Sequence, residues 1–395
     1  MTDKTQLTWP EQLRRDDREL KALTCMAQNL PATRPGVTLG VKDIIDVAGL
    51  PTECGSPIHA GQVAARSADC VTLLERAGAV VAGKTVTTEF ATTRPGPTCN
   101  PLNPAHTPGG SSSGSVAGVA AGLFDWALGT QTAGSVIRPA AYCGIAGFLP
   151  SPGVIPRRGV RIMSPTLDRV GVFARDMQGI AAMLEAFPGW SPAAMPDKAP
   201  RIAMLPRGVW EDSADEATCR TVLGTADALR DAGAEMTELD DPAPFLEMME
   251  AQKAVMGYEI PRALHRELAE HRDLLSEELR DYCDAALAIP HESYAAALKT
   301  ADRFRLWIGG VLEGHDAILG PSAAQLAPEG LGWTGDPFVN RIWSLAKLPA
   351  VSLPGAAARN GLKAAVQLTT GIGRDGLLCA LATRFAPLVA GIAPE

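Results

Sequence analysis

The chain has 395 residues, of which 46% are hydrophobic and 20% are charged, so it can bury a large core as an ordinary globular protein. Its formal net charge of -8, with basic residues scattered along the chain, excludes nucleic acid and anionic membranes as expected main partners. Because no apolar run is long enough to span a bilayer and the N-terminus lacks a signal-peptide pattern, we expect a cytoplasmic protein.

The N-terminal part of the chain alternates between expected helices and strands. A polar, periodic stretch predicts an amphipathic helix over 10–29, which the prolines and glycine of 31–36 end. The apolar run 37–41 predicts a buried strand, 70–77 a helix and 79–82 a second strand. This alternation is typical of an α/β architecture.

Small residues dominate the next segment, where we expect backbone rather than bulky side chains to line a site. The tract GGSSSGSVAGVAAG covers 109–122 and runs into an alanine-rich, helix-like stretch. A short strand is expected over 126–128, followed by a loop that carries Ser135 and by a Gly/Pro-rich stretch up to Pro156.

Helices dominate much of the second half of the chain. We expect helices over 175–187 and 213–232, and two or three helices between about 245 and 313, broken by Pro261 and Pro290. Three more strands and a closing helix are expected at 317–319, 350–353, 364–368 and 376–390.

These elements predict one large layered α/β domain over residues 1–395. Within it, the helix over 10–29 precedes a core of about 36–180, and a helical and C-terminal α/β portion covers about 195–395.

The three consecutive serines of the glycine-rich tract have several interpretations. A phosphate-binding loop is disfavoured because the tract lacks the Gly-Lys-Ser/Thr ending, and a plain linker is disfavoured because apolar elements bracket it. The pattern GxSxG places Ser112 at the centre of a nucleophile elbow, but 101–108 holds three prolines instead of a strand. The elbow also needs a late histidine, whereas the last one is His315 and the only one near the motif is His106.

A second serine centre lies in GTQTAGSVIRPAAYCG, where small residues around Ser135 leave backbone N–H groups free to form an oxyanion hole. Without a nearby histidine, the base for a serine hydroxyl would be a buried, neutral lysine, and Lys42 at the end of an apolar run fits that description. The alternative is that Lys42 pairs with Asp43 or Asp46. Composition and spacing alone leave both interpretations open.

Three segments, in order along the chain, together resemble the motifs of the amidase signature family. They are LGVKDIIDVAGLPTECGS (39–56), NPLNPAHTPGGSSSGS (100–115) and GTQTAGSVIRPAAYCG (129–144). Shorter likenesses, which extend the resemblance to the C-terminus, lie at 83–91, 164–176 and 348–368. The family implies a central mixed β-sheet that helices flank on both faces.

The resemblance also implies roles for individual residues. Ser135 corresponds to the family's nucleophile, Lys42 to its deep base, and Ser111 to the bridging serine that follows a cis peptide bond. The expected oxyanion hole consists of backbone N–H groups, those of Thr132, Ala133, Gly134 and Ser135. Ser112 is expected to support the serine loop by hydrogen bonding.

Some positions depart from the family pattern. Gln131 stands where many relatives have Asp, Ala133 replaces a Gly, and Arg138 lies three residues after the nucleophile instead of two. Arg138 is therefore expected either to brace the loop or to contact substrate. Arg94 and Trp333 are further candidates for substrate contacts, with a surface or packing role as the alternative for each.

The resemblance implies an amidase that hydrolyses the C–N bond of a small linear amide or a urea-like substrate through a serine acyl-enzyme. No metal or organic cofactor is implied, and the eight cysteines, which contain no CxxC pair, indicate neither a zinc site nor a disulfide framework. The sequence leaves the oligomeric state open, a homodimer included.

The alternative function is that of the amidase (A) subunit of an aminoacyl-tRNA amidotransferase, which the acidic charge and the lack of a basic patch disfavour. A catalytically silent relative is disfavoured because Lys42, Ser111 and Ser135 are all present. A membrane-associated fatty amide hydrolase is disfavoured because the N-terminus carries no apolar anchor.

Overall fold

A mixed β-sheet of 11 strands runs through the middle of the protein, in the order β1-β3-β2-β4-β6-β5-β10-β11-β9-β7-β8. The computed structural model describes residues 7–195 and 197–394. The strands are β1 (Leu23–Met26), β2 (Val37–Lys42), β3 (Ala79–Thr85), β4 (Trp126–Gln131), β5 (Ala146–Leu149), β6 (Arg169–Ala174), β7 (Arg201–Met204), β8 (Glu235–Glu238), β9 (Ala317–Pro321), β10 (Ala350–Ala357) and β11 (Lys363–Thr369).

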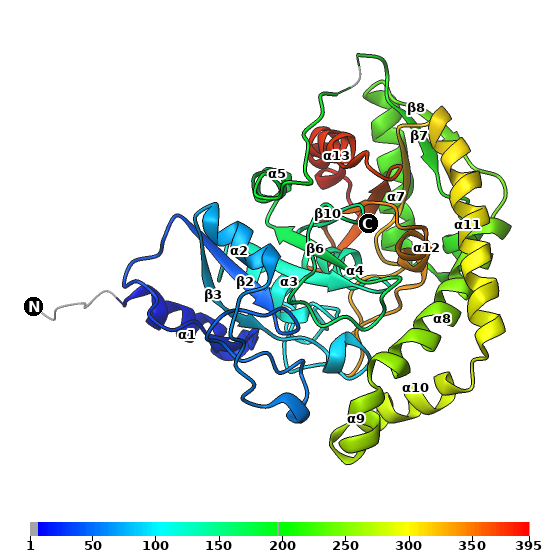
Figure 1. Ribbon diagram of the computed structural model, residues 1–395. Coiled ribbons are helices and arrows are strands. Elements are labelled where there is room, and N and C mark those ends of the chain that lie inside the picture. The colour runs from blue at the N-terminus through cyan, green and yellow to red at the C-terminus, as the bar shows by residue number, and fades with distance from the viewer. Residues whose placement is uncertain (1–6, 196, 395) are drawn as a thin grey trace, which may run out of the picture.

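Helices surround this sheet, as Figure 1 shows. They are α1 (Trp9–Leu20), α2 (Asp69–Arg76), α3 (Ser113–Ala120), α4 (Ile137–Cys143), α5 (Met177–Leu184), α6 (Arg207–Trp210), α7 (Glu216–Asp231), α8 (Ala243–Ala263), α9 (His265–Glu270), α10 (Glu277–Leu287), α11 (His291–Gly314), α12 (Phe338–Ala346) and α13 (Asp375–Ala390). Helices α8, α10 and α11 lie together on the side of the molecule away from α1 (Figure 1).

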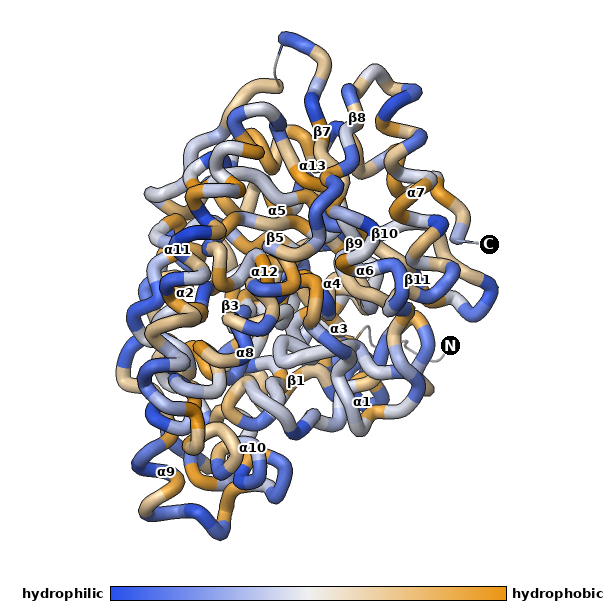
Figure 2. Tube along the Cα trace, turned by 90° about the vertical axis from the view of Figure 1, so that its right-hand side faces the viewer, coloured by the Kyte–Doolittle hydropathy of each residue, from blue (hydrophilic) through white to orange (hydrophobic). Residues whose placement is uncertain are grey.

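The two faces of the sheet are buried against different hydrophobic clusters, because successive residues of a strand point to opposite faces. In β4, Leu128 belongs to a cluster that also contains side chains of α2, α5 and α13, whereas the preceding Ala127 belongs to a second cluster with α3 and α4. In β6, Val172 and Phe173 divide in the same way. Figure 2 shows α4 and α12 as predominantly hydrophobic segments in the middle of the molecule. The expected mixed sheet with helices on both faces is confirmed.

The arrangement of β2 and β4 determines where the candidate site forms. The two strands are parallel neighbours, with Val41 opposite Leu128. Parallel neighbours end at the same edge of a sheet, so Lys42, the last residue of β2, lies beside Thr130 near the end of β4. The loop after β4 therefore begins next to the lysine.

The structure corrects the predicted N-terminal helix of 10–29. The helix ends at Leu20, because Lys21 takes a left-handed conformation (φ 54°), and Leu23–Met26 then form β1 as an antiparallel partner of β3. Periodicity failed here because a short, half-buried edge strand has no pattern distinct from the continuation of a helix.

The structure also corrects the expectation that Pro261 breaks a helix, since α8 continues through it to Ala263. Pro261 is buried in the last turn, where few backbone bonds remain to be lost. Pro290 does separate α10 from α11, as predicted. Helices α4, α6 and α12 and the strands β5, β6, β7 and β8 were not predicted, and the segment expected to hold two or three helices holds four, α8 to α11. None of the helices in the described part of the chain is long and apolar enough to cross a membrane.

Candidate active site

Lys42 is fully buried at the end of β2 and donates hydrogen bonds to hydroxyl groups. Its Nζ lies 2.7 Å from Ser111 Oγ and 2.9 Å from Thr130 Oγ1. The alternative pairing of Lys42 with Asp43 or Asp46 is not observed among the described residues, and Asp43 Oδ1 instead accepts from Lys84 Nζ at 2.8 Å. Lys42 is thus the buried amine that the sequence predicted.

Burial lowers the pKa of Lys42 to about 7, since the protein interior solvates an ammonium ion poorly. The carboxylate of Asp168 acts in the opposite direction and raises this pKa. A substantial fraction of Lys42 is therefore neutral near pH 7, and a neutral amine can accept a proton from a hydroxyl group.

The loop before α3 holds Ser111 next to Lys42. The peptide bond between Gly110 and Ser111 is cis, as the resemblance implied, and Ser111 O accepts a hydrogen bond from Thr88 N at 3.3 Å. A Cβ on Gly110 would lie 2.7 Å from Thr334 Cγ2, so only glycine fits at this position without displacing its neighbour.

Ser112 is fully buried, and its hydroxyl donates to the carbonyl oxygen of Thr130 at 3.4 Å. This contact agrees with the predicted supporting role. It does not agree with a nucleophile elbow, which presents its serine to substrate. His106 provides no base for it either, because its Nδ1 bonds to Ala327 O at 2.8 Å.

Gln131 fixes the loop that follows β4. Its Oε1 accepts hydrogen bonds from the N–H groups of Val136 (2.9 Å) and Ile137 (3.1 Å), at the start of α4. Its Nε2 donates to Ser344 Oγ at 3.0 Å, and Ser344 Oγ in turn donates to Ala133 O at 2.7 Å. Gln131 therefore caps α4 and links the loop to α12.

Thr132 connects the same loop to two residues that the sequence had not singled out. Its Oγ1 donates to Asp168 Oδ1 at 2.6 Å, and its carbonyl oxygen accepts from Gln252 Nε2 at 3.3 Å. Gln252 lies on α8 and is held by Arg341 Nη1 at 2.7 Å from its Oε1. An aspartate immediately before the apolar run of β6 was a usable signal for Asp168, whereas Gln252 is one of many polar residues on a long helix.

The backbone N–H groups of 132–135 are free to bind a ligand. In the described part of the chain, no hydrogen bond has any of these four groups as its donor. N–H groups without a hydrogen bond are available as donors to a bound oxygen atom. Ser135 is also the one partly exposed residue within 131–138. A Cβ on Gly134 would lie 2.5 Å from Asn340 Oδ1, so this loop is tightly confined.

Arg138 lies on α4 and is fully buried. Its Nη2 donates to Gly110 O at 2.7 Å and to Thr334 Oγ1 at 3.2 Å, which braces the serine loop. Within the described residues, its Nε and Nη1 have no hydrogen-bonding partner. Burial lowers its pKa to about 10, with smaller opposing effects from Tyr142 and Asp336.

A cavity of about 460 Å³ lies beside this loop. It is lined by Tyr142, Trp333 and Asp336 among others, and Trp333 is 56% exposed. Thr334, the neighbour of Trp333, accepts a hydrogen bond from Arg138 Nη2, which connects the segment that lines the cavity to the arginine that braces the serine loop. Arg94 is exposed, and no hydrogen bond or ion pair among the described residues joins its guanidinium to the residues around Lys42.

Comparison with known proteins gives matches across nearly the whole chain. Residues 6–379 match the family described as Amidase. The chain is 30% identical over 392 residues to the A subunit of the glutamyl-tRNA(Gln) amidotransferase of Methanothermobacter thermautotrophicus, and the match covers 89% of this chain and 85% of that protein.

Solved structures agree with this result. A crystal structure of an amidase superposes with a TM-score of 0.84 at 26% identity and covers 95% of each chain. The A subunit of the glutamyl-tRNA(Gln) amidotransferase of Thermotoga maritima has a TM-score of 0.82 at 24% identity, with 95% of this chain and 90% of that chain covered.

Proposed function

Because this chain belongs to the amidase family, we propose that it hydrolyses the C–N bond of a small amide or urea-like substrate through an acyl-enzyme formed on Ser135. The observation that carries the proposal is the buried pair of Lys42 and Ser111, joined by a hydrogen bond of 2.7 Å in which the amine has a pKa of about 7.

The proposed mechanism begins with proton transfer. Neutral Lys42 takes a proton from Ser111 Oγ as Ser111 takes one from Ser135, and the Ser135 oxygen attacks the carbonyl carbon. The negative charge that develops on the carbonyl oxygen is stabilised by the free N–H groups of the loop 132–135. The same relay returns the proton to the leaving amine, and water then cleaves the ester by the reverse route.

Arg138 supports a narrower substrate class. Its guanidinium keeps two N–H donors unpaired, among the described residues, in a buried position three residues after Ser135, and such donors bind a carboxylate strongly. We therefore expect an amide whose acyl part carries a carboxylate, such as the monoamide of a short dicarboxylic acid. The cavity beside Trp333 and Asp336 is the proposed route of entry.

A second candidate is the amidase (A) subunit of an aminoacyl-tRNA amidotransferase. The 30% identity to the A subunit of a glutamyl-tRNA(Gln) amidotransferase, over 89% of this chain, favours it. In that function, the same residues would release ammonia from an amide donor inside a complex with other proteins. Charge weighs against it, because the chain has a net charge of -8.

The deciding experiment measures ammonia release by the purified chain from neutral amides, monoamides of dicarboxylic acids, ureas and hydrazides. Ser135→Ala is expected to abolish turnover and Ser112→Ala to retain much of it. Added hydroxylamine should intercept the acyl-enzyme and give a hydroxamate. Loss of turnover only in Ser112→Ala would overturn the proposal in favour of the elbow.

The second candidate needs a different readout. The chain would then turn over no amide alone, would copurify with other subunits from its native host, and would release ammonia from glutamine only in that complex. Activity of the isolated chain on a small amide contradicts this candidate.

A further inference from the structure

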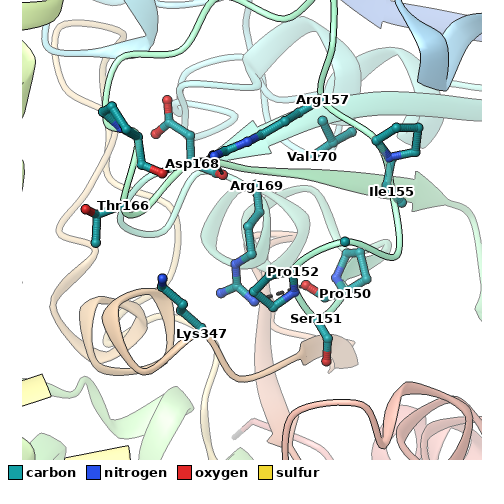
Figure 3. A pocket seen from close by; sticks show the side chains of 13 residues that line it. Pro150, Ser151, Pro152, Ile155, Arg157, Thr166, Asp168, Arg169, Val170 and Lys347 are labelled. Atoms are coloured by element: carbon teal, nitrogen blue, oxygen red, sulfur yellow. Dashed lines mark hydrogen bonds between the residues drawn. The ribbon is translucent and has the colours of Figure 1, made fainter. Parts of the chain in front are cut away.

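A cavity of about 310 Å³ lies between the loop 150–157, the start of β6 and Lys347 at the end of α12. Three of its lining residues are basic: Arg157, Arg169 and Lys347. Figure 3 shows the amine of Lys347 and the guanidinium of Arg169 facing each other across it, with Arg157 along one rim. It contains none of the proposed catalytic residues Lys42, Ser111 and Ser135, and it shares Asp168 with their surroundings.

Of the residues that line this cavity, three are basic and one, Asp168, is acidic. Lys347 Nζ has no hydrogen-bonding or ion-pair partner among the described residues. The buried Arg169 donates from Nη1 to the carbonyl oxygens of Pro150 and Leu348 and from Nη2 to that of Trp343, and its Nε has no partner among the described residues. Burial lowers the pKa of Lys347, Arg305, Arg169 and Arg157 lower it further, and Glu259 opposes them. Like charges gathered in this way repel one another unless an anion lies between them.

The carboxylates nearby have hydrogen bonds of their own. Asp168 accepts from Thr132 and from the N–H groups of Met163 and Ser164. Glu259 accepts from the hydroxyl groups of Thr166 and Tyr294. Asp375, which opposes the effect of burial on the pKa of Arg169, accepts from Ser151 N at 2.7 Å. Within the part of the chain that the structure describes, none of these three carboxylates forms an ion pair with a basic residue of the cavity.

Lys347 has a left-handed backbone conformation. Lys347 follows the last residue of α12 with φ 63° and ψ 20°, a left-handed conformation that glycine adopts without strain and other residues rarely take. Within the described part of the chain, its side chain forms no hydrogen bond that would offset the strain of this backbone conformation. The lysine instead contributes a positive charge at the cavity.

We propose that this cavity is a second ligand site, which binds a small oxyanion, a phosphate or carboxylate group, between Lys347, Arg157 and Arg169. Arginine and lysine donors on several sides of a small space suit the oxygens of such a group. The ligand would lie next to Asp168, whose carbonyl oxygen accepts from Arg157 Nη1 at 3.0 Å and whose carboxylate holds Thr132. Binding of the anion is therefore expected to affect the loop 132–135 through Asp168 and Thr132.

The test is isothermal titration calorimetry with inorganic phosphate and, separately, acetate, at an ionic strength held constant with chloride. Wild type is expected to bind at least one of them saturably, and Lys347→Gly to bind it at least tenfold more weakly. Lys347→Met, which keeps the length of the side chain without its charge, should show the same loss. Binding of phosphate alone indicates a phosphate ester as ligand, and binding of both indicates any small oxyanion.

A matched control separates the charge from the backbone effect. Lys21 also follows a helix with a positive φ of 54°, but it is exposed and does not line this cavity. Lys21→Gly should bind the anion as wild type does. The proposal is overturned if neither probe binds saturably to wild type, or if Lys347→Gly and Lys347→Met bind as tightly as wild type.

Discussion

The hydroxyl of Thr132 donates a hydrogen bond of 2.6 Å to Asp168 Oδ1, and the same carboxylate raises the pKa of Lys42. Asp168 thus acts on two parts of the site at once. It holds the loop whose N–H groups are free, and it opposes the effect of burial on the lysine. Burial raises the pKa of Asp168 itself, and its hydrogen bonds lower it.

Asp168→Asn should therefore shift the pH dependence of the reaction. The carboxylate favours protonated Lys42, so its removal lowers the pKa of Lys42 below about 7, and the acidic limb of kcat/KM moves to lower pH. Thr132→Val is the matched control, because it removes the hydrogen bond and keeps the charge. A limb that moves equally in both variants, or in neither, contradicts this role of Asp168.

In the wild type, kcat/KM should rise with pH through an apparent pKa of about 7, with a roughly tenfold loss for each pH unit below it. The reason is that only the neutral amine accepts the proton of Ser111. Lys42→Met and Lys42→Arg should both be inactive, since the first has no base and the second stays protonated. A flat profile between pH 5 and 9 would falsify the assignment of Lys42 as the base.

The same pKa makes a prediction for stability. The unfolded chain has a lysine pKa of 10.5 and the folded chain a value of about 7, so the unfolded state binds the additional proton between these values. The contribution of Lys42 to the free energy of unfolding therefore increases as pH rises from about 7 to 10.5. Denaturant unfolding of wild type and Lys42→Met, compared at pH 7 and 9, should show wild type gaining stability relative to the variant.

The sequence predicted the parts of the site that depend on local pattern. The position of Lys42 at the end of an apolar run was compatible with a buried base but also with an ion pair, and the family resemblance decided for the base and implied the cis peptide bond before Ser111. Such signals can be read from the sequence because the burial of a lysine and the need for a glycine each constrain a single position.

Contacts between distant segments were not predictable in this way. Gln252 meets Thr132 across 120 residues, and Ser344 meets Ala133 across 211, so neither pairing leaves a trace in the local sequence. The edge strands behave similarly, because β1 and β8 acquire their structure from one neighbour each and are only partly buried. Tertiary pairing decided these elements, and their sequence periodicity did not.

Gln131→Met should destabilise the protein and slow the reaction. It leaves the buried N–H groups of Val136 and Ile137 without their acceptor, at a cost of about 1–3 kcal/mol for each unsatisfied group, and removes one of the two hydrogen bonds of the Ser344 hydroxyl. Gln131→Glu keeps an acceptor for the two N–H groups and should lose less. Thermal unfolding and kcat on one amide check both variants, and a melting temperature of Gln131→Met equal to that of wild type contradicts the capping role.

Arg138→Met should lower kcat/KM more for an acidic amide than for a neutral one. The unpaired Nε and Nη1 are expected to bind a carboxylate of the substrate, and charge-assisted hydrogen bonds of this kind are worth roughly 1.5–3 kcal/mol, or about 10- to 100-fold in KM. A neutral amide of the same length has no such contact and should lose only the effect of the brace to Gly110 O, whose removal lowers kcat for both substrates.

The ratio of kcat/KM for the acidic and the neutral amide is therefore the decisive quantity, because the bracing role cancels in it. Arg94→Met, at an exposed arginine, should leave the ratio unchanged. If Arg138→Met lowers kcat/KM for the acidic and the neutral amide by the same factor, Arg138 only braces the loop and the substrate needs no carboxylate.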